Sequence, residues 1–363
     1  MQLGTVQSEP GEVVSGWVEA TDLPTGGAER LPLVVAEGVD DGPTLWMTGG
    51  VHGDEATGVA AVQDAIGSLP VERLAGTVAA VPVVNPAGLR QNRRRSYYGD
   101  DDPNRYFPDP ESASTRPPGV QERIDERLYE AFAESADALV DVHTAEIGSM
   151  PFVIRDRVLY GSRRDESAAE ALAEDLSRLV EAFGLPVLTE FPAEEYVEQG
   201  LQRSTAGAAL NAAGIPAFTV ELGGHSVVDE DARRAGVAGI YAAMVELGML
   251  TERPDGVGEP GAGVPDAPVE YPVRRTVHPR TETAGLVRHR VAPGDVVESG
   301  DVVAEVTTPQ GDVLDTVTSE HDGYVIARRE GLAAYEGDPV LSMAVRDEGD
   351  LVAPRDGDDG DEE

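Results

Sequence analysis

Apolar, strand-like runs alternate with helical patterns over most of this chain, and this alternation constrains its fold more than any other feature. Short apolar segments with the composition of buried strands lie at 45–48, 77–84, 138–144 and 216–222. Segments with apolar residues at helical spacing lie at 55–66, 120–135, 167–183 and 233–250. Strands that alternate with helices in this way predict an α/β domain with a mostly parallel or mixed sheet.

The pattern changes along the chain, and its 363 residues exceed the size at which one core usually stops growing, so we expect two domains. Residues 1–250 form the predicted α/β domain, and its first 40 residues read as an edge hairpin or sheet broken by DLPTGGAE. A Pro/Gly-rich linker is expected over 251–269 and a small all-β barrel or sandwich over 270–346. The acidic residues 347–363 are predicted to be disordered.

The charge of the chain excludes several classes of partner. It has 67 acidic residues against 28 basic ones, all of them arginine, for a net charge of −39. This balance argues against nucleic acid and against anionic membrane surfaces, since both require clustered cationic side chains. The long apolar segments rule out a disordered chain. We interpret the composition as a carboxylate-rich surface suited to a salty cytoplasm, where salt screens the self-repulsion.

Absent residue types exclude further chemistry. The chain has no cysteine and no lysine, which excludes disulfides, thiolate ligands, a Cys nucleophile, Schiff bases and the phosphate-binding P-loop. The amino-terminal sequence resembles no signal peptide, and no apolar run approaches the ~18 residues of a membrane span. We therefore expect a cytoplasmic protein, and the sequence leaves open whether it forms a homo-oligomer.

The strongest local motif is GGVHGDE, which follows the predicted strand at 45–48 directly. It places His52 and Glu55 three residues apart, between the end of a strand and the start of a helix. An imidazole and a carboxylate in this position are suitable zinc ligands, and a catalytic zinc site needs three protein ligands and one open position. Taken alone, the motif is more often a helix N-terminus with a solvated histidine.

Two more candidate residues lie at the ends of other predicted strands. His143 ends the strand in VDVHT, where Asp141 is close enough in sequence to support it, although a lone histidine there is more often structural. Glu221 follows the apolar run AFTV, and burial at a strand end would raise its pKa toward that of a general base. Alternatively, the Glu221 carboxylate faces solvent and has no catalytic role.

The carboxyl ends of strands meet at one edge of an open α/β sheet, and ligands bind at this edge. His52, Glu55, His143 and Glu221 all fall there. We therefore favour a shared metal site over separate structural roles.

An arginine cluster lies between these motifs. Five arginines occur within residues 90–105, in NPAGLRQNRRR and DPNRYFP. In a pocket, their guanidinium groups would bind a carboxylate or stabilise an oxyanion. On spacing alone, a surface cluster paired with acids such as Asp100 to Asp102 is equally consistent with the sequence.

The motifs GGVHGDE, NPAGLRQNRR, DPNRYFP, DVHT and VELGG, in this order, resemble the succinylglutamate desuccinylase/aspartoacylase family. These are zinc-dependent relatives of the metallocarboxypeptidases. The resemblance implies a carboxypeptidase-like mixed sheet flanked by helices, with one zinc ion bound by His52, Glu55 and His143. It also implies that Glu221 is the general base and later the proton donor.

The resemblance extends to residues that bind the substrate. Asn104 and Arg105 match the family's Asn-Arg pair, which contacts a substrate carboxylate or the oxyanion. Arg94 is the best match to the upstream arginine, and Arg93 and Arg95 remain open because SYYGDD lengthens this loop. The family's Asp-Leu-Asn-Arg is Asp-Pro-Asn-Arg here, which stiffens the turn.

The C-terminal β region resembles lipoyl/biotinyl-like barrels. A swinging-arm function is excluded because there is no lysine to modify, which leaves a role in shaping the pocket or in an oligomer contact. His225, after the double glycine in VELGGH, is a turn residue, a substrate contact or a fourth ligand, and we favour the turn slightly.

These observations predict a zinc-dependent amide hydrolase that removes an acyl group from an N-acyl amino acid or a related small amine. Glu221 would take the proton of the attacking water. Two alternatives are a metallocarboxypeptidase acting on peptide C-termini and a non-catalytic zinc-binding assembly protein.

Overall fold

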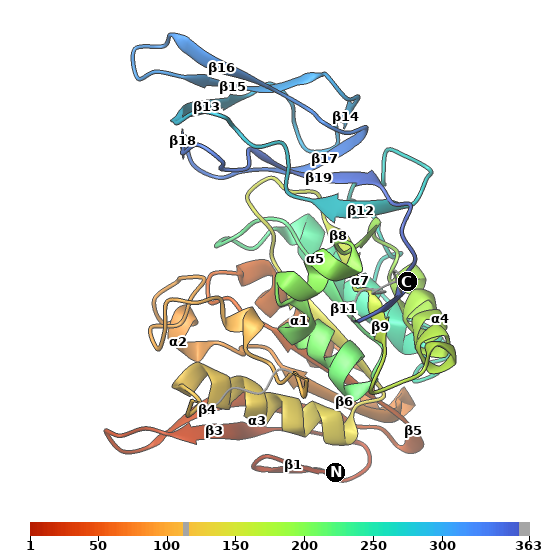
Figure 1. Ribbon diagram of the computed structural model, residues 1–363. Coiled ribbons are helices and arrows are strands. Elements are labelled where there is room, and N and C mark those ends of the chain that lie inside the picture. Colours follow the sequence, from red (N-terminus) through yellow and green to blue (C-terminus); the bar gives the residue numbers. More distant parts are fainter. Residues whose placement is uncertain (112–115, 356–363) are drawn as a thin grey trace, which may run out of the picture.

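A twelve-stranded mixed sheet forms the centre of the molecule (Figure 1). The structure is a computed structural model that describes residues 1–111 and 116–355. The strand order is β14-β17-β19-β12-β10-β8-β11-β7-β5-β6-β4-β3. Helices pack against this sheet, as the alternating pattern predicts, and a second, four-stranded sheet follows at the C-terminal end of the chain.

Parallel strands at the centre of this sheet form in the four apolar runs of the sequence, although the strand expected over 77–84 ends at Val81. They are β5 (Asp40–Gly49), β6 (Ala75–Val81), β7 (Ala138–His143) and β11 (Ala217–Glu221). β7 pairs in parallel with both β5 and β11, and every residue of β7 is buried. Strands buried on both faces need apolar residues throughout, which explains why these segments read as continuous apolar runs.

An N-terminal hairpin forms one edge of the sheet, as the sequence predicts. β3 (Glu12–Asp22) and β4 (Ala28–Glu37) pair in antiparallel orientation across the segment DLPTGGAE. Gly26 and Gly27 in this turn both have positive φ, a conformation that glycine adopts without steric cost. β4 then pairs with β6, which joins the hairpin to the central strands.

The four predicted helices are present, with ends close to the expected ones. They are α1 (Ala56–Gly67), α3 (Val120–Ser135), α4 (Glu166–Phe183) and α7 (Glu230–Glu246). α4 starts where the Asp165 carboxylate accepts a hydrogen bond from the Ala168 amide, and it ends at Gly184 in the left-handed conformation. α7 packs against both α1 and α4, so these three helices form one layer.

Shorter elements complete the α/β part. The strands are β1 (Gln2–Leu3), β2 (Val6–Gln7), β8 (Phe152–Arg155), β9 (Val158–Tyr160) and β10 (Val187–Thr189). The short helices are η1 (Val71–Arg73), α2 (Pro86–Leu89), η2 (Pro103–Arg105), α5 (Ala193–Glu198), η3 (Leu201–Arg203), α6 (Thr205–Gly207) and the π-helix η4 (Ala208–Ala213).

The C-terminal region is all-β, in agreement with the prediction, and part of it extends the main sheet. β12 (Val273–Thr276) pairs with β10, and β19 (Leu341–Arg346), β17 (Gly323–Arg328) and β14 (Val296–Val297) follow. The other sheet contains β16 (Val313–Thr318), β15 (Val302–Thr307), β13 (Gly285–His289) and β18 (Ala333–Ala334). Residues 251–269 contain neither helix nor strand. The boundaries of the expected domains stay a prediction, because the sheet runs through both parts.

The acidic composition predicts disorder from residue 347 onward, but the structure places residues 347–355. β20 (Val352–Pro354) pairs in parallel with β9. The buried Arg157 guanidinium donates to Asp347 at 2.9 Å and to the carbonyl of Asp350 at 3.0 Å, which holds this segment against the α/β part. The remainder of the predicted tail, 356–363, lies outside the described residues.

No helix in the described part of the chain is long and apolar enough to cross a membrane.

Candidate active site

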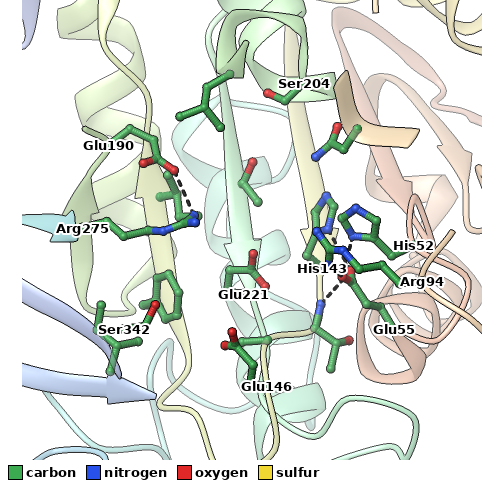
Figure 2. Close-up of a pocket in the computed structure, with 18 of the residues that line it drawn as sticks. His52, Glu55, Arg94, His143, Glu146, Glu190, Ser204, Glu221, Arg275 and Ser342 are labelled. Carbon is green, nitrogen blue, oxygen red and sulfur yellow. Dashed lines mark hydrogen bonds and ion pairs between the residues drawn. The ribbon is translucent and has the colours of Figure 1, made fainter. Parts of the chain in front are cut away.

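The candidate active site is a cavity of about 320 Å³ at the carboxyl ends of β5, β7 and β11. All seven residues that the sequence singles out for this site line it: His52, Glu55, Arg94, Asn104, Arg105, His143 and Glu221. Figure 2 shows the labelled side chains of this set converging from separate elements. The cavity therefore lies at the sheet edge where α/β folds bind ligands.

A tight loop between β5 and α1 positions His52 and Glu55. Glu55 is the residue directly before α1, and Gly50 in the same loop has a positive φ of 57°. The loop lies directly against α2. A Cβ on Gly53 would come within 2.1 Å of the Gly88 backbone. Only glycine permits this contact, which explains Gly53 of the GGVHGDE motif, whereas Gly50 is explained by its positive φ.

His52, Glu55 and His143 converge on one point. Nδ1 of His52 lies 2.6 Å from Oε1 of Glu55, and Nδ1 of His143 lies 2.8 Å from Oε2 of the same carboxylate. Their candidate ligand atoms all lie within 4.8 Å of one another, and all three side chains are buried. Two imidazoles and one carboxylate are a donor set that divalent zinc accepts, with a fourth position left for water or substrate.

A second carboxylate orients each histidine. Nε2 of His143 lies 2.8 Å from Asp141, whose other oxygen accepts a hydrogen bond from Thr48 at 2.7 Å. Nε2 of His52 lies 2.9 Å from Asp102. With both Nε2 atoms held in this way, the Nδ1 atoms are the ones available to a metal ion. Carboxylates on the far nitrogen of metal-binding histidines are a common feature of metal sites.

The electrostatics of the three residues are those of a preformed cation site. Burial favours the neutral form of Glu55, yet the neighbouring His52 and His143 hold the pKa of its carboxyl well below the usual range. Burial also opposes protonation of His143, but Asp141 and Glu55 raise its pKa well above the usual value. The surrounding carboxylates therefore favour positive charge at this position, which a bound cation would supply.

Glu221 lies at the last position of β11, directly opposite His143 in the register of the two strands. Burial is the largest influence on its carboxyl and, together with the negative charge of Glu55, raises its pKa to about 7, although the neighbouring His143 and Arg275 act in the opposite direction. A carboxyl with a pKa near neutrality both accepts and returns a proton at physiological pH.

The structure distinguishes among the three consecutive arginines. Of the three, Arg94 lines the cavity, where it donates to Glu55 at 3.2 Å and to Asp102 at 3.0 Å. This position agrees with the choice of Arg94 over Arg93 and Arg95.

Asn104 and Arg105 reach the cavity from the short helix η2. The Asn104 carbonyl oxygen accepts hydrogen bonds from the Thr205 amide and hydroxyl at 2.8 and 3.1 Å, which leaves its amide nitrogen as the donor. Arg105 donates to the backbone carbonyl of Asn104 at 2.6 Å, and Arg105 also lines the cavity. The site therefore holds donors that suit a carboxylate or an oxyanion.

His225 lies in a turn, as we favoured, and also borders the cavity. Its φ is 48°, its carbonyl accepts the Ala56 amide at the start of α1, and its ring lies 3.6 Å from Asp54. Among the described residues it does not belong to the group of candidate metal ligands.

Sequence reasoning missed several residues of the site. The sequence alone does not distinguish Asp102 from the neighbouring acids, and its position in DPNR is the one signal that could identify it. Arg275 comes from β12 in the C-terminal region and donates to Glu190 at 3.0 Å on the opposite side of the cavity from His52 (Figure 2). No local motif signals Arg275, because only the pairing of β10 with β12 brings it to the cavity.

Residues 41–247 match the family described as succinylglutamate desuccinylase/aspartoacylase catalytic domain. The chain belongs to this family. The match covers more than half of the chain and includes every residue placed above at the metal site. As a member of the family, the chain is a deacylase, a hydrolase of an amide bond, with a His-Glu-His metal site. This assignment confirms the predicted enzyme class and favours it over the carboxypeptidase and assembly alternatives.

Individual relatives extend the likeness over almost the whole chain. It is 28% identical over 353 residues, 94% of each sequence, to an N-alpha-acetyl-L-2,4-diaminobutyric acid deacetylase of Halomonas elongata. Its fold is similar to a succinylglutamate desuccinylase/aspartoacylase of Rhodobacter sphaeroides (TM-score 0.72, 23% identity, 93% and 96% of the two chains). It is also similar to the product-bound ectoine utilization protein EutE (DoeB) of Ruegeria pomeroyi (TM-score 0.73, 21% identity, 94% and 98%). The predicted mixed α/β fold with a C-terminal all-β region is thereby confirmed.

Proposed function

We propose that this chain is a zinc-dependent deacylase that hydrolyses small N-acyl amino acids. The observation that carries the proposal is the convergence of His52, Glu55 and His143 in a cavity that also contains Glu221. Family membership supports an amide substrate, and the relative from Halomonas elongata is a deacetylase of an acetylated amino acid.

The donor set fits a zinc ion. Two Nδ1 atoms and one carboxylate would hold it, and Asp102 and Asp141 would orient the two rings through Nε2. A zinc ion bound there would supply Lewis-acid polarisation of the acyl carbonyl and would lower the pKa of water.

Glu221 is the proposed proton carrier of the reaction. Its carboxylate takes the proton of the attacking water and then delivers it to the nitrogen of the departing amine. This double role needs a carboxyl whose pKa lies near the working pH, and burial raises that of Glu221 to about 7.

The cationic and amide side chains of the site are proposed to bind the substrate. Arg105 would hold the carboxylate of the amino acid, since this residue lines the cavity and a main-chain hydrogen bond fixes the position of its guanidinium. The amide nitrogen of Asn104 and the guanidinium of Arg94 are donors for the oxyanion that develops on the acyl group.

The direct test is hydrolysis of a panel of acetyl-, succinyl- and formyl-amino acids beside blocked dipeptides, with the zinc content measured in parallel. We expect turnover of at least one acyl amino acid, loss of turnover on chelation and recovery when zinc is restored. A protein that holds zinc stoichiometrically but hydrolyses no compound of the panel would contradict the proposed function.

A further inference from the structure

The end of the cavity opposite the metal ligands holds charged groups that the hydrolytic reaction does not use. Figure 2 shows the Glu190–Arg275 pair on one side, His52 and Glu55 on the other, and Glu221 between them. Glu190 is only 2% exposed, and both of its oxygens have partners, in the Arg275 guanidinium and the Phe191 amide. The Glu190–Arg275 pair is therefore internally neutral.

Asp156 adds a further carboxylate on the same wall. It follows β8, whose Phe152 and Ile154 pair with Glu221 and Thr219 of the antiparallel neighbour β11. Because alternate strand residues share a face, Phe152, Ile154 and Asp156 all border the cavity. Asp156 therefore lies on the wall that contains Glu221, further from the end of β11.

Other side chains hold Asp156 in place. The Tyr196 hydroxyl accepts a hydrogen bond from Asn211 at 3.3 Å and itself bonds to the Asp156 carboxyl. Asn211 is fixed in turn, because its amide group donates to the Arg157 carbonyl at 3.0 Å and accepts from the Leu159 amide at 2.8 Å. A carboxylate positioned by such a network suits a binding site, because it loses little freedom when a ligand arrives.

Asp156 nevertheless lacks a counter-charge. The residue is only 4% exposed, its Oδ2 has no hydrogen-bond partner, and it forms no salt bridge within the described part of the chain. Burial, with the nearby Glu190, raises the pKa of its carboxyl well above the usual range. Arg105 and Arg275 lower that pKa in smaller measure. A buried carboxyl of this kind is costly unless a partner compensates it.

We propose that Asp156 binds a side-chain ammonium group of the substrate, so that the enzyme prefers N-acyl amino acids with a second amine. The inference rests on the proposed deacylase function. A substrate of this class carries a carboxylate, which suits Arg105, and a cation, which suits the incompletely satisfied carboxyl of Asp156; both residues line the cavity. Arg105 and Asp156 thus offer an oppositely charged partner for each charged end of such a molecule.

Binding of two free amino acids tests this subsite independently of hydrolysis. 2,4-Diaminobutyrate has a side-chain ammonium, and norvaline has a methyl group at the same position. In calorimetric titrations of the zinc-loaded protein, we expect 2,4-diaminobutyrate to bind at least about tenfold more tightly, as a charged hydrogen bond requires. Equal affinity for the two compounds would overturn the proposal.

Two variants test whether Asp156 causes the preference for 2,4-diaminobutyrate over norvaline. Asp156→Asn keeps the shape and an acceptor for Tyr196 but removes the charge, so the two affinities should become equal. Asp125→Asn is the matched control, because Asp125 in α3 is also fully buried with an unpartnered Oδ2 but does not border the cavity. It should keep the wild-type preference. A preference that survives Asp156→Asn, or is lost equally in Asp125→Asn, would contradict the assignment.

Hydrolysis of the corresponding N-acetyl compounds separates this inference from the proposed function. Selective binding of the diamino acid without any hydrolysis would support the Asp156 subsite and contradict the deacylase. Hydrolysis of N-acetyl-norvaline as efficiently as the diamino compound would support the deacylase and contradict the subsite.

Discussion

Both histidines of the site present Nδ1 to Glu55 because a carboxylate occupies Nε2 of each ring. Asp141 contacts Nε2 of His143 from two positions earlier in the same strand, and a regular strand is sufficient to align the two side chains. Asp102 contacts Nε2 of His52 from a loop 50 residues away in the sequence. Asp102 also accepts a hydrogen bond from Arg94, which connects this arginine to the metal site. The contact between Asp141 and His143 can therefore be predicted from the sequence, whereas the contact between Asp102 and His52 cannot.

Replacing Asp102 tests its contribution to cation binding. In Asp102→Asn, the His52 ring loses its charged partner at Nε2, and zinc affinity should fall by about 10- to 100-fold. Competition with a chromophoric chelator measures this affinity without an activity assay. The exposed Asp101→Asn is the matched control, and zinc affinity unchanged in both variants would contradict the role of Asp102.

The pH dependence of turnover should report Glu221. Its pKa is raised to about 7 in the protein without a metal ion, and only the ionised form accepts a proton, so kcat/KM should decrease as the pH falls through the pKa of Glu221. A bound cation favours the ionised form and moves this limb to lower pH. In Glu221→Gln, kcat should fall by roughly two or more orders of magnitude while zinc is retained. The zinc content is measured at each pH, so that loss of metal is not mistaken for an effect on Glu221. Near-native turnover in the zinc-loaded variant would contradict the role of Glu221 as general base.

At the scale of elements, α1 can lie close to the central strand because of a glycine on the contact face. A Cβ on Gly58 would come within 2.4 Å of the Val142 carbonyl in β7. Gly67, at the end of the same helix, has no atom within 4 Å of such a Cβ. The two glycines therefore differ in packing although they share one helix.

Alanine at these two positions should have different effects on stability. Gly58→Ala forces α1 away from β7 and should reduce the free energy of unfolding by about 1–3 kcal/mol. Gly67→Ala should leave it unchanged or raise it by up to about 1 kcal/mol, because alanine is the better helix former. Urea unfolding followed by circular dichroism measures both, and equal effects would contradict this packing.

Elements were predictable from the sequence where the signal is local. β7 and α4 have a continuous apolar run and a periodic apolar stripe, and both occur within a residue or two of the expected ends. The attachment of β12 to β10 was not predictable, because it depends on one pairing between distant segments. Likewise, the acidic composition of the tail does not predict the short strand β20, because this strand depends on its pairing with β9.

At the scale of the whole molecule, the net charge of −39 should make stability depend on salt. Excess carboxylates repel one another, and added ions screen that repulsion over a few ångströms. The midpoint of thermal unfolding should therefore rise between about 0.1 M and about 1 M KCl. A midpoint that stays constant or falls over this range would contradict the interpretation of the surface as adapted to salt.

The proposed reaction requires that His52, Glu55 and His143 share one cation, and the zinc content of the purified protein tests this most directly. After dialysis against zinc and removal of the excess, mass spectrometry should find one zinc ion per wild-type chain. His143→Ala should lose it, whereas His321→Ala, an exposed histidine outside the site, should keep it. Full zinc content in a folded His143→Ala protein, or none in the wild type, would contradict the account.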